Sequence, residues 1–153
     1  MLQPRRATRR RLGRVAISGS ARDAAAMRSW KQRWEAAGYE VVDYPRPIPV
    51  TSLAADYPEV YRYFHDVVRS VDILFVANLD RGGVVGYIGA ATFAEMNFVN
   101  ARNVLEEQRT RILLLQAPGE AVASRSEVGL WLAQGWIERV DEGEFGLAIG
   151  EPA

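Results

Sequence analysis

The sequence predicts a domain of the α/β class, in which helices cover both faces of a parallel sheet. Two apolar runs, Ile73–Ala77 and Ile112–Gln116, lack the polar alternation of a half-exposed strand and indicate strands buried on both faces. Segments with helical periodicity separate the predicted strands. Strands that alternate with helices are joined by right-handed crossovers, and such crossovers produce a parallel sheet.

The first third of the chain contains two predicted strands and one helix. Val15–Ser18 is a short apolar strand, and a helix is expected over about Asp23–Ala37. Gly38 suits the end of that helix, because glycine readily adopts the left-handed conformation found there. Tyr39–Asp43 alternates as a strand does. The apolar positions of the helix recur three or four residues apart, at Met27, Trp30, Trp34 and Ala37.

The middle of the chain continues the alternation. Prolines at 45, 47 and 49 force an extended connection, and a second helix is expected over about Pro58–Ser70, because proline suits the first turn of a helix. The buried strand 73–77 follows, and then the glycine-rich loop Asn78–Gly89. A third helix is expected over about Ala90–Glu107.

The last part of the chain completes the predicted sheet. The strand 112–116 precedes a turn at Pro118-Gly119 and a helix over Ser126–Gln134. A last short strand is expected within Trp136–Val140 or Phe145–Ile149. Together these elements predict a three-layer, flavodoxin-like (Rossmann-like) domain with a four- or five-stranded parallel sheet.

Length and charge indicate one domain with a charged leader. A chain of 153 residues, with 48% hydrophobic and 25% charged residues, is long enough to bury one core. We assign residues 14–150 to a single α/β domain and residues 1–13, which are rich in arginine, to a disordered leader. Such a leader can contact nucleic acid, but a solvated segment explains the same charges, so a nucleic-acid partner is not expected.

The composition excludes several kinds of chemistry. The chain has no cysteine, which excludes disulfides and thiolate ligands, and a single histidine, His65, which excludes a His-rich metal site. No apolar stretch approaches the roughly 20 residues that span a bilayer, and no secretory signal is evident. We therefore expect a cytoplasmic protein without a membrane partner.

The turn after the first strand is a candidate anion site. Gly19 and Ser20 precede the first helix, and backbone N–H groups at the start of a helix attract negative charge. Arg22 adds a forked cation that suits phosphate. The alternative is a plain turn in which glycine and serine serve only the backbone geometry and the helix cap.

The second glycine-rich loop and the helix after it contain the central candidate. The loop 78–89 is long, which is typical of functional loops, and we include Asn78, Tyr87 and Gly89 among the candidate substrate-binding residues. Glu95 follows in an otherwise apolar helix, at a position close to its apolar face. A buried carboxylate is usually paired or functional, whereas a glutamate at the surface of the first turns would merely favour the helix dipole.

The second predicted helix contains further titratable and aromatic residues. His65 and Asp66 lie near its end, and a lone histidine there is more often structural than catalytic. Tyr57, Tyr61 and Tyr63 cluster nearby. Their rings could stack on a nucleobase or fill a core or an interface.

Three segments resemble the nucleoside 2-deoxyribosyltransferase superfamily, which includes deoxynucleoside 5′-monophosphate N-glycosidases. The segments are Ile17-Ser-Gly-Ser-Ala-Arg22, residues 64–77, and Gly86-Tyr-Ile-Gly-Ala-Ala-Thr-Phe-Ala-Glu-Met96, and the resemblance covers roughly residues 15–116. It implies that Glu95 attacks the anomeric carbon of a nucleoside or nucleotide, displaces the base and forms a glycosyl ester. It also implies that Gly19, Ser20 and Arg22 hold a 5′-phosphate, and that no cofactor or metal is needed.

The chain departs from the family pattern at two positions. The family's acid on the second helix corresponds to Phe64, so we expect His65 or Asp66 to assist the leaving base instead. Asn97 replaces a glycine two residues after the glutamate. These departures leave two other hypotheses open, a nucleotide-sensing module in which Glu95 accepts hydrogen bonds from ribose hydroxyls, and a scaffold that keeps only the fold. The resemblance and the four tryptophans also predict a homo-oligomer, a dimer or larger.

Overall fold

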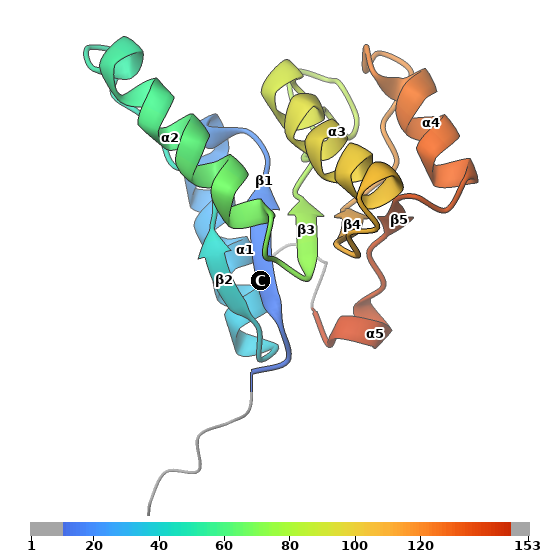
Figure 1. Cartoon of the computed structure of the whole chain (residues 1–153). Coiled ribbons are helices and arrows are strands. Elements are labelled where there is room, and N and C mark those ends of the chain that lie inside the picture. The colour runs from blue at the N-terminus through green and yellow to red at the C-terminus, as the bar shows by residue number, and fades with distance from the viewer. Residues whose placement is uncertain (1–10, 148–153) are drawn as a thin grey trace, which may run out of the picture.

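The computed structural model of the chain describes residues 11–147 and has the expected α/β architecture (Figure 1). The strands are β1 (Arg14–Ser18), β2 (Glu40–Asp43), β3 (Ile73–Val76), β4 (Arg111–Leu114) and β5 (Glu138–Arg139). A 3-10 turn, η1 (Ala21–Asp23), leads into the first of five helices. The helices are α1 (Ala24–Ala36), α2 (Leu53–Val68), α3 (Ala90–Leu105), α4 (Arg125–Ala133) and α5 (Glu142–Phe145).

All strand pairs of the sheet are parallel, in the order β2-β1-β3-β4-β5. Helices α2, α3 and α4 lie on one face of this sheet and α1 lies on the other (Figure 1). The three-layer, flavodoxin-like fold expected from the sequence is therefore confirmed, with five strands rather than four.

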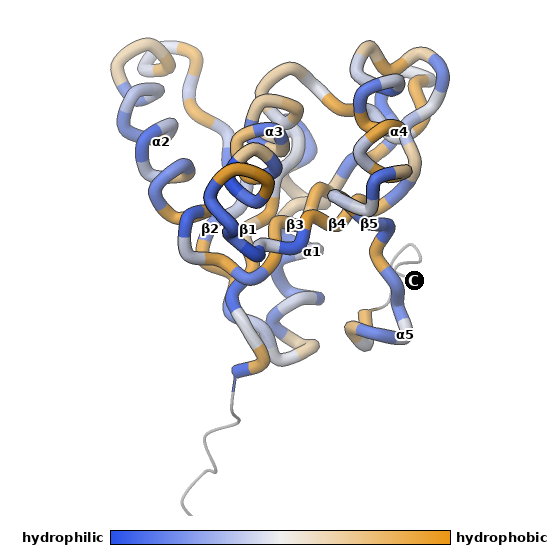
Figure 2. The backbone as a smooth tube through the Cα atoms, turned by 45° about the vertical axis from the view of Figure 1, so that its right-hand side comes forward, coloured by the Kyte–Doolittle hydropathy of each residue, from blue (hydrophilic) through white to orange (hydrophobic). Residues whose placement is uncertain are grey.

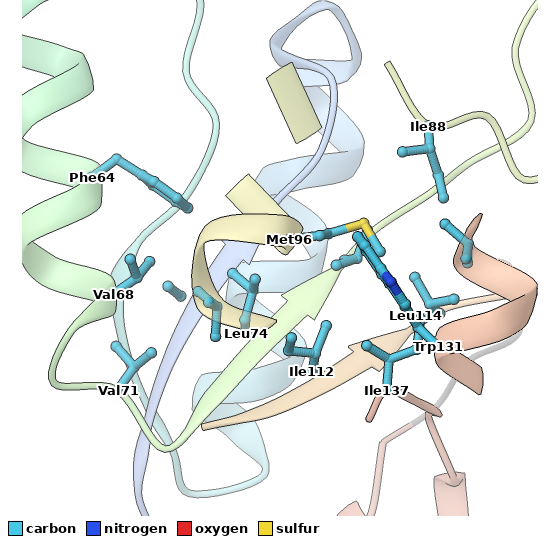
Figure 3. Close-up of a cluster of buried hydrophobic side chains, with 14 of the residues drawn as sticks. Phe64, Val68, Val71, Leu74, Ile88, Met96, Ile112, Leu114, Trp131 and Ile137 are labelled. Atoms are coloured by element: carbon cyan, nitrogen blue, oxygen red, sulfur yellow. The ribbon is translucent and has the colours of Figure 1, made fainter. Parts of the chain in front are cut away.

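Each face of the sheet has its own hydrophobic core. On the side of α2, α3 and α4, residues such as Leu74, Met96 and Trp131 pack over the sheet (Figure 3). On the side of α1, Trp30 and Trp34 pack against Phe75, and Phe145 of α5 joins them. β3 and β4, in the middle of the sheet between these two cores, are formed largely by hydrophobic residues (Figure 2). Burying each large side chain contributes about 1.5–3 kcal/mol, so the two cores account for the stability of the layers.

The tryptophans do not form an exposed set. Trp30, Trp34 and Trp131 are buried, and Trp136 alone of the four is exposed, at 46%. The core of this chain therefore holds more large aromatic side chains than the sequence argument for self-association assumed. That argument was wrong for Trp30, Trp34 and Trp131, and of the four tryptophans only Trp136 offers an exposed ring.

The second and last helices differ from the sequence expectation. α2 begins at Leu53 rather than Pro58, so the proline lies inside the helix and one backbone hydrogen bond is absent there. The residues of α2 before Pro58 are exposed. Near the end of the chain, β5 confirms a strand within 136–140, whereas Phe145 ends the short helix α5.

The predicted leader falls largely outside the described residues, which exclude 1–10 and 148–153. Of that leader, Leu12 donates its N–H to the carbonyl of Gly38, and the carbonyl of Gly13 accepts the N–H of Glu40. These two contacts extend the pairing of β1 with β2 toward the N-terminus. Within residues 11–147, no helix has the length and apolar character required to cross a membrane.

Candidate functional site

The order of the strands creates a switch point between β1 and β3. The chain passes from β1 to β2 on one side and then returns over β1 to β3 on the other. The connections after β1 and β3 therefore leave toward opposite faces of the sheet. The carboxyl ends of two such strands form the crevice in which open α/β sheets bind their ligands. Ser18 ends β1, and Asn78 lies just beyond β3.

Glu95 faces this crevice from the second turn of α3. Its side chain is partly buried, and the hydroxyl of Ser18 donates a hydrogen bond to its Oε2 atom. Burial raises the pKa of Glu95 from 4.5 to about 7; the hydrogen bond from Ser18 opposes this rise and the charge of Asp43 adds to it. Oε1 accepts no hydrogen bond from the described residues. Of the two orientations that the helical pattern left open, the inward one is present, with one carboxylate oxygen bonded to Ser18 and the other available.

Asp43 is a second buried carboxylate beside Glu95, and no sequence motif marks it. It ends β2, and its side chain is 9% exposed. Its Oδ1 atom accepts the N–H of Tyr44 at 2.9 Å and an N–H of Arg46 at 3.1 Å. Burial raises the pKa of Asp43, and the contacts from Tyr44 and Arg46 oppose that rise.

The turn after β1 meets the loop after β3 through Arg81. Ser20 caps η1 by accepting the N–H of Arg22 at 3.3 Å, and its hydroxyl also accepts an N–H of Arg81 at 3.0 Å. The Arg81 guanidinium lies 5.4 Å from the centre of the Tyr87 ring. Arg22 itself is exposed. The two loops that the sequence singled out are thus joined, and Arg81 adds a second cation beside Ser20.

Asn78 ties the end of β3 to the end of β4. Its amide N–H groups donate to the carbonyls of Gln116 at 2.7 Å and Gly86 at 3.3 Å, and its Oδ1 accepts the N–H of Gln116 at 3.2 Å. The Asp80 carboxylate accepts the N–H of Gly86 and a side-chain N–H of Gln116, both at 2.8 Å. In this structure the side chain of Asn78 therefore positions the loop, and its substrate contact stays a prediction.

Gly86 and Gly89 shape the same loop for different reasons. Gly86 has φ of 59°, and a Cβ there would lie 2.7 Å from the carbonyl oxygen of Ala117, so only glycine fits without displacement. Gly89 is the N-cap of α3 and lies against the ring of Tyr87. The close approach of the Gly86 and Ala117 backbones fixes where α3 begins, and hence where Glu95 lies.

The structure does not bring His65 or Asp66 into contact with Glu95. The His65 ring stacks on Tyr61, with centroids 4.0 Å apart, and meets the edge of Phe98 on α3. Asp66 has a side chain that is 76% exposed and lies 3.8 Å from Arg69. Both line an open groove of about 600 Å³ that is formed by α2 and Phe98 of α3 and is called the outer groove below, and Glu95 is not among the residues that line it.

Three residues of the site were missed or left without a role by sequence reasoning. Ser18 looked like an ordinary strand end, and Asp43 looked like the last position of an alternating strand. Arg81 was visible as part of a long loop, but its contact with Ser20 depends on how two distant loops fold. The glycine and serine of the turn after β1 were the only local feature of the sequence that indicated a contact at Ser20.

No protein-family model matches the chain, and no curated protein or solved structure matches it. The superfamily resemblance of the three sequence segments therefore stays a prediction. What can be inferred about function comes from the side chains at the switch point.

Proposed function

We propose that the protein cleaves or exchanges the N-glycosidic bond of a nucleoside or nucleotide, with Glu95 as the nucleophile. The observation that carries this proposal is a desolvated carboxylate at the switch point, fixed through one oxygen by Ser18. Burying a carboxylate without an ion pair is costly, and such groups concentrate at functional sites. The superfamily resemblance points to the same residue and the same bond.

The reaction suits a carboxylate in this position. Oε1 of Glu95 would attack the anomeric carbon as the base leaves, and the glycosyl ester would then be released by water or by a second base. The transition state resembles an oxocarbenium ion, and an adjacent negative charge stabilises it. The hydrogen bond from Ser18 keeps the attacking side chain in one orientation while leaving Oε1 available.

The turn after β1 supports a phosphate group on the substrate. Ser20 and Arg81 are already in contact there, and Arg22 is exposed beside them. Two guanidinium groups and a hydroxyl can donate several charge-assisted hydrogen bonds to one phosphate. We infer that this turn holds the 5′-phosphate of a nucleoside monophosphate.

A self-associating protein is part of the same proposal. Leu53, Tyr57, Val60, Tyr61 and Tyr63 of α2 are between 44% and 52% exposed. They lie between residues 53 and 63 of α2, and the N-terminal part of this helix extends past the ends of the strands (Figure 1). A contiguous apolar surface of this kind favours contact with another protein surface, and the superfamily resemblance favours a second copy.

Two experiments separate an enzyme from a nucleotide sensor. The protein would be incubated with a panel of ribo- and deoxyribonucleoside 5′-monophosphates, and free base would be measured by chromatography. The enzyme proposal predicts base release that Glu95→Ala abolishes, whereas Glu127→Gln, at an exposed position in the first turn of α4, retains it. Thermal stabilisation by a nucleotide without release of base would instead support sensing, and absence of both would leave a scaffold.

A further inference from the structure

We propose that Asp43 is the general acid and base of the glycosidic cleavage, protonating the leaving base while Glu95 attacks the sugar. This inference rests on the proposed function. It replaces His65 and Asp66, which line the outer groove, with a carboxylate that the fold brings to the switch point.

A register irregularity turns Asp43 toward Glu95. Val15 pairs with Val41, but the next residue, Ala16, pairs with Asp43, so β2 contains one extra residue at this point. Partner residues of adjacent strands point to the same face of a sheet, and bulges of this kind re-aim side chains near active sites. Val41 packs in the core on the α1 side, whereas Ala16 lies in the core on the α3 side.

The extra residue therefore places Asp43 on the face that carries Glu95. Ser18 follows Ala16 by two residues, so it points to that face as well, and it donates to Glu95. Without the irregularity, Asp43 would lie on the α1 side together with Val41, because residues two apart in a regular strand share a face. The irregularity is what brings the two carboxylates into one site.

The contacts of Asp43 leave one oxygen available to a substrate. Tyr44 and Arg46 both donate to Oδ1, whereas Oδ2 accepts no hydrogen bond from the described residues. The side chain is nevertheless nine-tenths buried. A carboxyl group fixed through Oδ1 presents Oδ2 in one direction, as a proton donor or acceptor toward a bound base requires.

The two carboxylates divide the roles between them. A negative charge on one carboxylate disfavours ionisation of a neighbouring one. The field of Asp43 raises the pKa of Glu95 for this reason, in addition to burial. The proton of the pair can lie on Glu95 or on Asp43, and the reactive form that the proposal requires has Glu95 ionised, with its charge stabilised by the hydroxyl of Ser18, and the proton on Oδ2 of Asp43.

The step balances without any co-reactant. Oε1 of Glu95 forms a bond to the anomeric carbon as the bond from that carbon to the base nitrogen breaks. The electron pair of the broken bond goes to the base, and the proton on Oδ2 of Asp43 goes to a ring nitrogen of the base. Asp43, now ionised, takes a proton from the water that attacks the same carbon, which releases the sugar and restores ionised Glu95 and protonated Asp43.

The test compares two leaving groups. A purine nucleoside monophosphate that the wild type cleaves would be assayed beside its 7-methyl derivative, whose base carries a fixed positive charge and leaves without protonation. Asp43→Asn keeps the Oδ1 acceptor but holds no acidic proton. We expect it to lower kcat on the unmodified nucleotide by at least about 100-fold and on the 7-methyl nucleotide by less than 10-fold. Glu95→Gln should abolish cleavage of both.

Equal loss on both substrates by a folded Asp43→Asn protein, or no loss on either, would overturn the role of Asp43 and leave that of Glu95 intact. Circular dichroism and a melting curve establish folding. If the asparagine variant does not fold, the smaller Asp43→Ser replacement carries the same expectation. A wild-type protein that releases base from neither nucleotide would overturn the proposed function, and the role of Asp43 with it.

Discussion

Replacing Glu95 by glutamine should stabilise the protein at pH 8 and change its stability little near pH 4. Burial raises the pKa of folded Glu95 from 4.5 to about 7. Between these values the folded protein binds more protons than the unfolded chain, so the free energy of unfolding falls as the pH rises. The difference between the two pKa values corresponds to a loss of about 3 kcal/mol in the free energy of unfolding. The Glu95→Gln variant does not lose this stability at high pH, because glutamine has no charge to bury, and its amide oxygen still accepts a hydrogen bond from the hydroxyl of Ser18.

Urea or thermal unfolding of wild type and variant at pH 4, 6 and 8 measures this effect. The difference in unfolding free energy between the two proteins should grow by about 3 kcal/mol from pH 4 to pH 8, or roughly 6–12 °C in Tm for a chain of this size. The exposed Glu127→Gln variant should follow the wild type at every pH. Parallel profiles for wild type and Glu95→Gln would refute the reasoning, because they would mean that Glu95 titrates as it does in water.

Three further predictions concern the neighbours of Glu95 and the surface of α2. Ser18→Ala should lower the unfolding free energy by about 1.5–3 kcal/mol at pH 8, because the lost hydrogen bond then has a charged acceptor, and by less at pH 4. An equal loss of unfolding free energy at the two pH values would contradict this prediction. Gly86→Ala should lower the unfolding free energy by more than the roughly 1–2 kcal/mol that a left-handed backbone costs, because the new Cβ would also contact Ala117. Gly83, with φ of 79°, has open space around it, so Gly83→Ala should lower the unfolding free energy by the backbone cost alone. Equal melting curves for the two variants would exclude the contact with Ala117. Light scattering at micromolar concentration should show a dimer or larger species that Tyr61→Glu dissociates, and a monomeric wild type would refute self-association.

The strands were the most predictable part of the fold. β1 and β3 lie within one residue of their expected ends, because strands buried on both faces are continuous apolar runs in the sequence. The start of α2 was missed by five residues. The apolar residues of its first turns, Leu53 and Tyr57, are exposed rather than packed on the sheet, and Pro58 was predicted as the start because proline suits the first turn of a helix.

The site was predictable only where one helix decides it. The helical pattern placed Glu95 close to the apolar face of α3 but left open whether it lies inward or at the surface, and the hydrogen bond from Ser18 shows the inward orientation. Ser18 and Asp43 belong to different strands, and their meeting with Glu95 depends on strand order and on the extra residue in β2. His65 and Asp66 were placed near the site because they follow Phe64, the position that corresponds to the family's acid on the second helix, whereas the structure has them line the outer groove.

Loss of the register irregularity in β2 would separate the architecture of this protein from its chemistry. With regular pairing of the same residues, the strand order and both cores would persist, but Ala16 would pair with Val42, and Asp43 would pair with Ile17 and face α1 instead of Glu95. Two chains with the same Glu95, the same glycines and superimposable backbones elsewhere could then differ in whether a leaving group is protonated. In this fold the spacing of a four-residue edge strand is therefore as informative about reactivity as the identity of the nucleophile.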